Sequence, residues 1–236
     1  MNDRYQNLQR KIDQLLEHKN NLNILEAGCG STSKIHLKNV SKITGIDISK
    51  KQLNCNTVIH EKILGDIQTY KLSESTYDVI VCWNVLEHLK KPKLAVLNFF
   101  HAIKDDGLII LALPNVFSVK GLITKYTPLW FHKLIYIYIY KNKKMVTEEK
   151  GPFKTYLRYF TAPKSLLKFS RKNGFRPVYF SKARAIDGWV GEKISNKSKF
   201  LYSFIASSIK IAKKVTFNQI SYSDYIVILK TTDAGI

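Results

Sequence analysis

The chain has 236 residues, of which 45% are hydrophobic and 24% are charged. This composition is typical of a globular protein and excludes a disordered chain, and the length suits one domain with a substantial core, which we expect over residues 1–236. The formal net charge is +20, from 38 Lys and Arg against 18 Asp and Glu. Such an excess favours anionic surroundings such as nucleic acid, anionic lipid or a phosphorylated substrate.

The N-terminal residues and the cysteines indicate the cellular compartment. The three cysteines form no C-x-x-C pair and cannot make a disulfide framework, which points to a reducing environment. No charged leader precedes an apolar run, so no secretory signal is expected, and the predicted location is the cytoplasm. Residues 1–21 are polar, with aliphatic residues at helical spacing. They predict an amphipathic helix lying across the edge of the core.

A glycine-rich turn follows the first predicted strand. Residues 23–30, NILEAGCG, predict a short buried strand that ends in a turn where a ligand can approach the backbone closely. After a gap of one helix length, residues 43–47, ITGID, predict a second strand that ends in Asp47. Residues 63–67 and 77–82 predict a third and a fourth strand. The alternation predicts an α/β fold, a doubly wound parallel sheet with helices on both faces.

The glycine spacing distinguishes two classes of nucleoside cofactor. A dinucleotide fingerprint is G-x-G-x-x-G, whereas this turn has Gly28, Gly30 and then Ser33. Glu26, two residues before the first glycine, would repel a pyrophosphate and favour a cation. S-adenosylmethionine (SAM) has no phosphate and carries a sulfonium and an ammonium group. The turn therefore favours SAM over NAD.

The chain changes character after the fifth predicted strand, residues 108–113. Residues 93–103 predict the preceding helix, which a turn at 105–107 would end. Residues 116–155 are rich in aromatic and basic residues and predict an inserted lid or substrate segment. Residues 116–145 equally suit a peripheral contact with a membrane interface, and the run at 130–140 is too short, and too interrupted by His132 and Lys133, to span a bilayer. Both alternatives stay open.

The C-terminal part, residues 156–236, completes the predicted sheet. Residues 162–173 predict a helix that ends at an Asn-Gly pair, and residues 175–180 predict the sixth strand. Residues 197–214 form a second basic amphipathic pattern of helical period, and residues 222–229 predict the last strand.

Five ordered motifs carry a resemblance to a known family. They are ILEAGCG at 24–30, GIDIS at 45–49, GDI at 65–67, YDVIVCWNVLEHL at 77–89 and GLIILALPN at 107–115. With them the chain resembles the class I SAM-dependent methyltransferases, in particular the ubiquinone-biosynthesis-like, methyltransferase type 11 group. The resemblance implies a Rossmann-like sheet of seven strands whose last strand is antiparallel, between strands five and six.

The resemblance also implies a role for each motif. The turn would line the methionine end of SAM, Asp47 would accept the ribose hydroxyls, and Asp66 would bind the adenine amine. The implied cofactor-binding residues are Glu26, Ala27, Gly28, Cys29, Gly30, Asp47, Ile48, Asp66, Ile67, Trp83 and Asn84.

The segment after the fourth strand supplies the candidate for catalysis. If a helix begins at Trp83, then Asn84, Glu87 and His88 share one face. His88 has a suitable pKa for removing the proton of an acceptor hydroxyl, and the alternative is that it only caps and orients the helix. Some relatives bind a divalent metal with Glu-x-x-Glu-His here. Because Asn84 replaces the first Glu, the sequence disfavours a metal, and no metal ligand is predicted.

The methyl acceptor is the least determined feature. The chain lacks the proline-containing loop of amino-group methyltransferases after strand four, so oxygen is the favoured acceptor. We expect a small-molecule, sugar or lipid-linked hydroxyl, with His132, Tyr156 and Arg158 as substrate-binding candidates, although these residues could be purely structural. An RNA methyltransferase and a non-catalytic binding protein are the alternatives. Nucleic acid is less favoured because the basic residues are scattered. The sequence does not indicate an oligomeric state.

Overall fold

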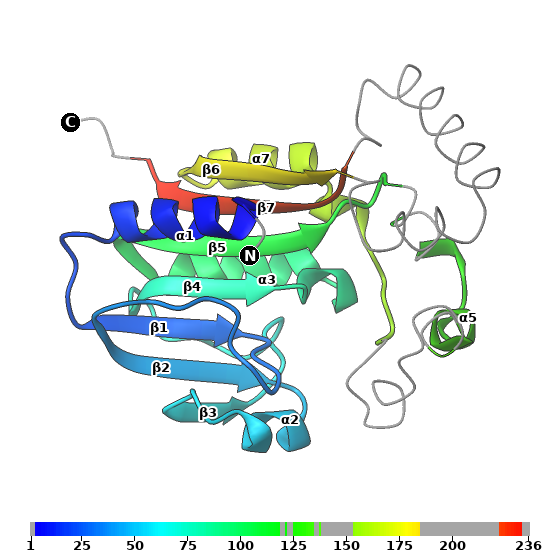
Figure 1. Cartoon of the computed structure of the whole chain (residues 1–236), viewed down its shortest axis with the longest axis horizontal. Helices are drawn as coiled ribbons and strands as arrows, with labels where there is room; N and C mark the ends of the chain where they lie inside the picture. The colour runs from blue at the N-terminus through cyan, green and yellow to red at the C-terminus, as the bar shows by residue number, and fades with distance from the viewer. Residues whose placement is uncertain are drawn as a thin grey trace.

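The structure is a computed structural model and describes residues 3–118, 121, 125–134, 137, 153–184 and 222–232. The described helices are α1 (Asp3–Leu15), α2 (Lys50–Cys55), α3 (Pro92–Ala102), α5 (Leu129–Leu134) and α7 (Pro163–Lys172), with single-turn 3-10 helices η1 (Leu86–His88) and η3 (Tyr159–Thr161). The strands are β1 (Leu22–Ala27), β2 (Val40–Asp47), β3 (Glu61–Leu64), β4 (Tyr77–Trp83), β5 (Ile103–Pro114), β6 (Phe175–Arg184) and β7 (Tyr222–Thr231). Figure 1 shows their arrangement.

The strands form one seven-stranded sheet in the order β3-β2-β1-β4-β5-β7-β6 (Figure 1). The first five strands are parallel to one another, and β7 runs antiparallel to both β5 and β6. The predicted Rossmann-like sheet, with the last strand between strands five and six, is confirmed. Because parallel strands end at the same edge, the segments that follow β1, β2, β3 and β4 meet there.

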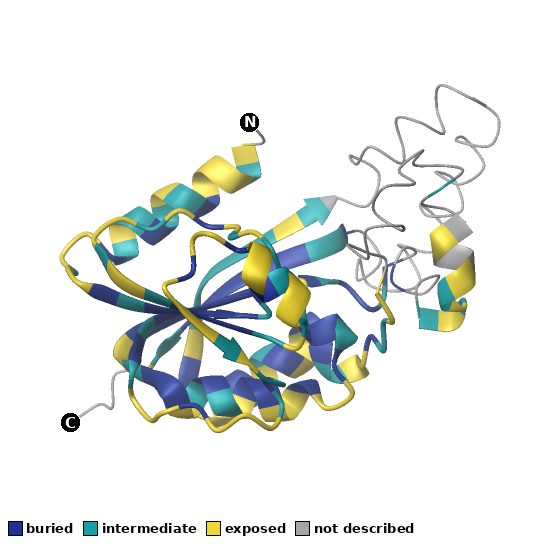
Figure 2. Ribbon diagram, turned by 90° about the horizontal axis from the view of Figure 1, so that it is seen from below, coloured by how far each residue is buried: buried dark blue, intermediate teal, exposed yellow. Residues whose placement is uncertain are grey.

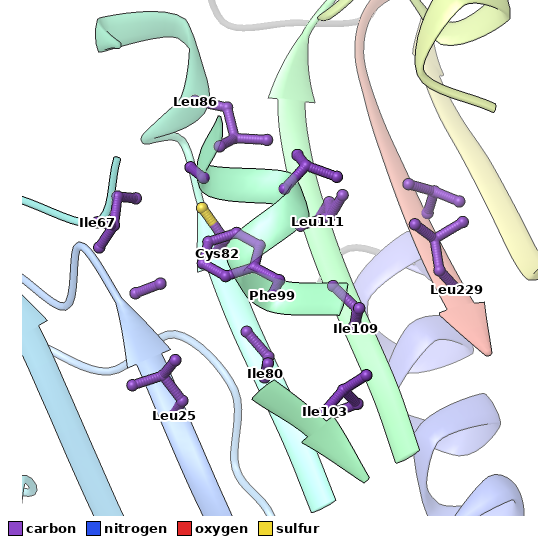
Figure 3. Packing of buried hydrophobic residues seen from close by; sticks show 14 of the residues in the cluster. Leu25, Ile67, Ile80, Cys82, Leu86, Phe99, Ile103, Ile109, Leu111 and Leu229 are labelled. Atoms are coloured by element: carbon purple, nitrogen blue, oxygen red, sulfur yellow. The ribbon is translucent and has the colours of Figure 1, made fainter. Parts of the chain in front are cut away.

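Strand alternation sends side chains to two separate cores. On one face, Phe99 of α3 is fully buried among Ile80, Cys82 and Ile109 (Figure 3). On the other face, Leu8 and the fully buried Ile12 of α1 pack in one cluster with alternate residues of β1, β4, β5 and β7. Figure 1 shows α1 in front of the sheet and α3 and α7 behind it, and Figure 2 shows the buried strands between these layers.

The helices behind the sheet begin and end at the residues that the sequence indicates. Pro92 and Pro163 are the first residues of α3 and α7, where the missing N–H costs no helical hydrogen bond. Helix α7 ends at Asn173, and Gly174 follows with φ +80°, a left-handed conformation that glycine adopts without strain. The predicted helix at 162–173 is therefore confirmed.

Three local predictions were wrong. The N-terminal helix ends at Leu15, short of residue 21. Residues 28–39 contain no helix, although the gap between the first two strands has the length of one. Ile35 from this gap is buried in the same cluster as α1, so the N-terminal helix covers the face that a crossover helix would cover. The expected turn at 105–107 lies within β5, where Asp106 has φ +60°.

Two predicted segments lie mostly or wholly outside the described residues. Of the predicted lid at 116–155, the structure describes α5 and a few flanking residues, and the basic helix at 197–214 is not described. The lid, the membrane contact and the domain boundaries therefore stay predictions. In the described part of the chain, no helix has both the length and the hydropathy needed to cross a bilayer.

Candidate functional site

The glycine turn after β1 is held in a conformation that requires its glycines. Gly28 and Gly30 have φ values of +71° and +53°, and the Gly28 N–H donates to the Ile46 carbonyl at 2.7 Å. A Cβ on Gly28 would lie 2.4 Å from Cγ2 of Val85. The turn thus packs directly against the loop after β4, which brings the candidate cofactor and acceptor regions into contact.

Asp47, the last residue of β2, holds the turn from the side. Its Oδ2 accepts the Gly30 N–H at 2.9 Å, and its Oδ1 accepts the Ser49 N–H at 2.8 Å. A carboxylate oxygen has room for a second donor, so Asp47 can still accept ribose hydroxyls. The fully buried Asn56 adds a second support, since its amide donates to the carbonyls of Cys29 and Gly30.

Glu26 is a buried carboxyl beside this turn, with 6% of its surface exposed. Burial raises its pKa, and a 2.8 Å hydrogen bond from the Ser33 hydroxyl and the charge of Lys34 counteract the shift. Burial, together with Asp47 and Glu26, raises the pKa of the Cys29 thiol to about 12, so this thiol stays protonated. Glu26 would therefore attract a cationic group near the turn, whereas the neutral Cys29 thiol would contribute no charge.

The adenine candidates lie at the ends of β2 and β3. Ile48 is 76% exposed beside Asp47, which leaves its side chain available to a flat apolar ligand. Ile67 is only 3% exposed and belongs to the core behind the sheet. Both oxygens of Asp66 accept from the Gln68 amide, at 3.0 and 2.9 Å, and the Gln68 carbonyl accepts the Lys91 N–H. Gln68 therefore links Asp66, a candidate for binding adenine, to the segment before α3.

The end of β4 differs from the expected helix. The Trp83 ring stacks on Tyr5 of α1, with centroids 6.0 Å apart. Asn84 has φ +54°, its backbone N–H donates to the Ala112 carbonyl, and only the single turn η1 follows. Asn84, Glu87 and His88 therefore do not lie on one helix face, because the left-handed Asn84 turns the chain before η1 begins.

His88 is fixed by a segment that lies far away in the sequence. Its Nδ1 is 2.9 Å from the Lys154 carbonyl oxygen, which can only accept, so Nδ1 carries the proton and Nε2 has a lone pair in the neutral ring. Nε2 lies 4.0 Å from Oε1 of Glu87, and the Phe153 ring meets the imidazole edge-on at 5.8 Å. Burial lowers the pKa of His88, against the opposing effect of the Lys154 hydrogen bond.

The backbone of residues 153–158 is bonded to the loop after β4. The Glu87 carbonyl accepts the N–H groups of Tyr156 and Leu157, both at 2.9 Å, and Leu157 is fully buried. The exposed Arg158 donates from Nε to the Lys90 carbonyl at 3.2 Å. The structure therefore brings Tyr156 and Arg158 next to His88. His132 lies in α5, and its side chain is outside the described residues.

Several supporting residues were not found from the sequence. Ser33, Asn56 and Gln68 hold Glu26, the turn carbonyls and Asp66, and the Lys154 carbonyl orients His88. None of them has a motif of its own, and the His88 contact joins residues 66 positions apart. Among the residues that the structure describes, no three His, Cys, Asp or Glu side chains gather as a metal site.

Comparison with protein families adds independent evidence to this geometry. The model of a methyltransferase domain family matches residues 2–179, which is most of the chain. The chain belongs to the methyltransferase domain family. The family match, the strand order and the turn after β1 together identify a class I SAM-dependent methyltransferase domain.

Individual relatives of this methyltransferase domain are distant. The ubiquinone biosynthesis O-methyltransferase of Rickettsia typhi is 28% identical over 118 residues, which cover 44% of this chain and 47% of the relative. The malonyl-[acyl-carrier protein] O-methyltransferase of Bacillus anthracis is 29% identical over 129 residues, covering 47% of each. The chain thus spans about half the length of these curated relatives.

A solved structure extends the similarity to the whole fold. The magnesium protoporphyrin IX methyltransferase of Synechocystis, solved with bound S-adenosylhomocysteine (SAH), superposes with a TM-score of 0.51 at 12% identity. The alignment covers 97% of this chain and 84% of that protein. At this identity the comparison supports the fold alone, and the acceptor has to be inferred from the site.

Proposed function

We propose that the methyltransferase domain transfers a methyl group from SAM to a hydroxyl oxygen of a small-molecule, sugar or lipid-linked acceptor. The observation that carries this proposal is His88, whose Nδ1 is fixed as a donor by the Lys154 carbonyl, so that Nε2 is the proton acceptor. Two distant relatives that are named as O-methyltransferases support oxygen as the acceptor atom.

The cofactor would lie across the edge where β1, β2 and β3 end. When bound, SAM supplies an electrophilic methyl group on a sulfonium. Gly28 and Gly30 allow the left-handed backbone of the turn, and the carboxylate of Glu26 suits the ammonium end. Asp47 would accept the ribose hydroxyls, and Ile48 and Asp66 would contact the adenine from its face and its edge.

His88 would remove the proton that the acceptor hydroxyl loses. Transfer would break the bond between the sulfonium sulfur and the methyl carbon and leave SAH, while Nε2 of His88 would take the hydroxyl proton and later release it to solvent. The resulting imidazolium would face Oε1 of Glu87 at 4.0 Å. The lowered pKa of His88 keeps the ring neutral and ready to accept a proton at pH 7.

The acceptor would enter beside residues 153–158. Two cations lie near the Tyr156 ring, with Lys154 Nζ 5.3 Å and Arg158 Cζ 5.7 Å from its centroid. Arg158 is exposed next to His88 and can pair with a carboxylate or phosphate on the acceptor. His132 remains a third substrate-binding candidate.

Two measurements, made one after the other, test the proposal. Calorimetric titration with SAH, with NADH as the control, should show micromolar binding of SAH alone, and absence of SAH binding would overturn the cofactor assignment. Transfer of radiolabelled methyl from SAM should then be compared between matched hydroxyl and amine acceptors. Label on the hydroxyl compounds supports the proposal, whereas label on the amines alone would contradict oxygen transfer.

A further inference from the structure

Helix α7 carries a stripe of positive charge on its outer side. Lys164, Lys168, Arg171 and Lys172 recur at helical spacing, and all four are exposed. The buried side of the helix is formed by Pro163, Leu166 and Ser170. From residue 153 to residue 184 the chain has nine Lys and Arg and no Asp or Glu. The charge of this region is therefore concentrated and uncompensated within its own segment.

Helix α3 extends this charged surface and adds exposed apolar groups. Phe100 of α3 stacks on Phe169 of α7 at 6.0 Å, so the two helices are neighbours. Lys93 Nζ lies 5.1 Å above the Phe169 ring. Leu94 and Leu97 on the outer side of α3 are 41% and 38% exposed.

We name this surface the basic α3–α7 face. Its members are Lys90, Lys91, Lys93, Leu94, Leu97, Lys164, Lys168, Arg171 and Lys172. From residue 88 to residue 104 the chain has no Asp or Glu, and Asp66 reaches the Lys91 backbone through the side chain of Gln68.

The chemistry of the face fits an anionic lipid surface. Basic side chains near a leaflet of anionic lipid each contribute attraction, and exposed leucines between them can enter the headgroup boundary. Non-specific binding of single-stranded nucleic acid depends instead on exposed aromatic rings on which bases stack. The basic α3–α7 face has no aromatic member, and the neighbouring Phe169 is half-buried beneath Lys93.

We propose that the basic α3–α7 face docks the domain on a membrane that contains anionic phospholipid. The face begins two residues after His88, and Arg158 donates to the carbonyl of Lys90, its first residue. Docking would therefore hold the loop that carries the candidate base close to the headgroups, where a lipid-linked acceptor presents its hydroxyl. This inference concerns a surface outside the proposed active site and differs from a membrane contact made by residues 116–145.

Vesicle co-sedimentation of the full chain tests the proposal without any cofactor or acceptor, so it can fail independently of the proposed function. Vesicles of phosphatidylglycerol and phosphatidylcholine should bind the protein, and vesicles of phosphatidylcholine alone should not. The triple variant Lys164→Gln/Lys168→Gln/Arg171→Gln should weaken binding on the order of 100-fold, because each surface cation contributes about fivefold. Circular dichroism should show an unchanged fold, since all three side chains are exposed.

The matched control removes three charges from the α1 side. Arg10→Gln/Lys11→Gln/Lys38→Gln lowers the net charge equally and should leave most of the vesicle binding intact. Equal losses in the two triple variants would overturn the proposal, because binding would then follow total charge. Unchanged binding in the α7 variant would also overturn it and return the contact to residues 116–145. Tighter binding to poly(U) RNA than to vesicles at the same ionic strength would replace lipid by nucleic acid as the partner.

Discussion

The cofactor side and the acceptor side of this domain are built differently. On the cofactor side, the glycine turn is held by Asp47, 17 residues after Gly30 and on the adjacent strand. On the acceptor side, His88 depends on the carbonyl of Lys154, which is 66 residues away and enters from outside the sheet. The cofactor side is thus complete within neighbouring βα units, whereas the acceptor side exists only when two distant segments meet.

The two sides approach each other closely between Gly28 and Val85. Through this contact, a small change on the cofactor side can affect the acceptor side, and the reverse. Replacing Gly28 therefore has two costs, the backbone strain of positive φ and the steric clash of the added Cβ with Val85.

Gly28→Ala should have the largest effect on stability. The new methyl combines left-handed strain with a 2.4 Å approach to Val85, which together cost about 2–5 kcal/mol of the free energy of unfolding. Gly174→Ala is the matched control, because Gly174 has φ +80° but its added Cβ would meet nothing closer than 3.9 Å. It should cost only about 1–2 kcal/mol. Equal losses by urea unfolding would show that the contact between the two sides carries no energy.

His88→Ala should lower kcat by about 10²-fold or more if the imidazole is the base. SAH binding should stay close to that of the parent, because no described cofactor contact passes through His88. The pH profile provides a second readout: burial lowers the pKa of His88, so the acid limb of kcat should lie below the ordinary value of 6.5.

Thr155→Val is the control for His88. Thr155 Oγ1 is 3.3 Å from Nδ1, but the Lys154 carbonyl at 2.9 Å would still fix the ring. A change of kcat of less than about threefold is expected, since the proton on Nδ1 keeps its acceptor. A loss in Thr155→Val as large as in His88→Ala would assign the segment at 153–158 a structural role only.

Asp47→Ala should weaken SAH binding by about 1.5–3 kcal/mol, the contribution of hydrogen bonds to a charged group. The same change removes the acceptor of the Gly30 and Ser49 N–H groups, so the turn itself should loosen. Asp47→Asn keeps one carbonyl acceptor and should fall between the parent and Asp47→Ala. Calorimetric titration gives all three affinities, and an unchanged Kd for Asp47→Ala would contradict the cofactor site.

The same difference explains how much could be predicted from the sequence. The strands and the turn were predictable because glycines, strand-end acids and apolar runs are local signals, whereas the strand order followed from the family resemblance. The helix expected at 83–88 was wrong because the left-handed Asn84 is a single-residue event that periodicity does not register. The role of Lys154 was invisible because its contribution is a backbone carbonyl, which any residue at that position would supply.

Supporting polar residues were missed for a related reason. Asn56 and Gln68 act through amides that reach across a loop, and many sequences have such amides without any contact. Tyr156 and Arg158 were predicted as substrate candidates from the chemistry of their side chains, and the structure shows backbone and Nε bonds from them to the loop after β4. Their proximity to His88 comes from these bonds, so sequence could suggest the residues but could not place them.

Ser33→Ala should produce the smallest effect. It acts through the pKa of Glu26, on which ligand affinity and the free energy of unfolding depend with opposite pH slopes. Burial raises the pKa of Glu26 and the Ser33 hydroxyl lowers it, so the variant should move the pKa further upward. A cationic ligand needs the carboxylate, so SAH affinity should fall as the pH drops through this pKa, and should fall at a higher pH in the variant.

A carboxyl with a raised pKa in the folded state binds more protons there than when unfolded, so its contribution to the free energy of unfolding should grow as the pH falls. Calorimetric titration and urea unfolding over the same pH range should therefore give opposite slopes for this group, and parallel slopes would remove Glu26 from the cofactor site.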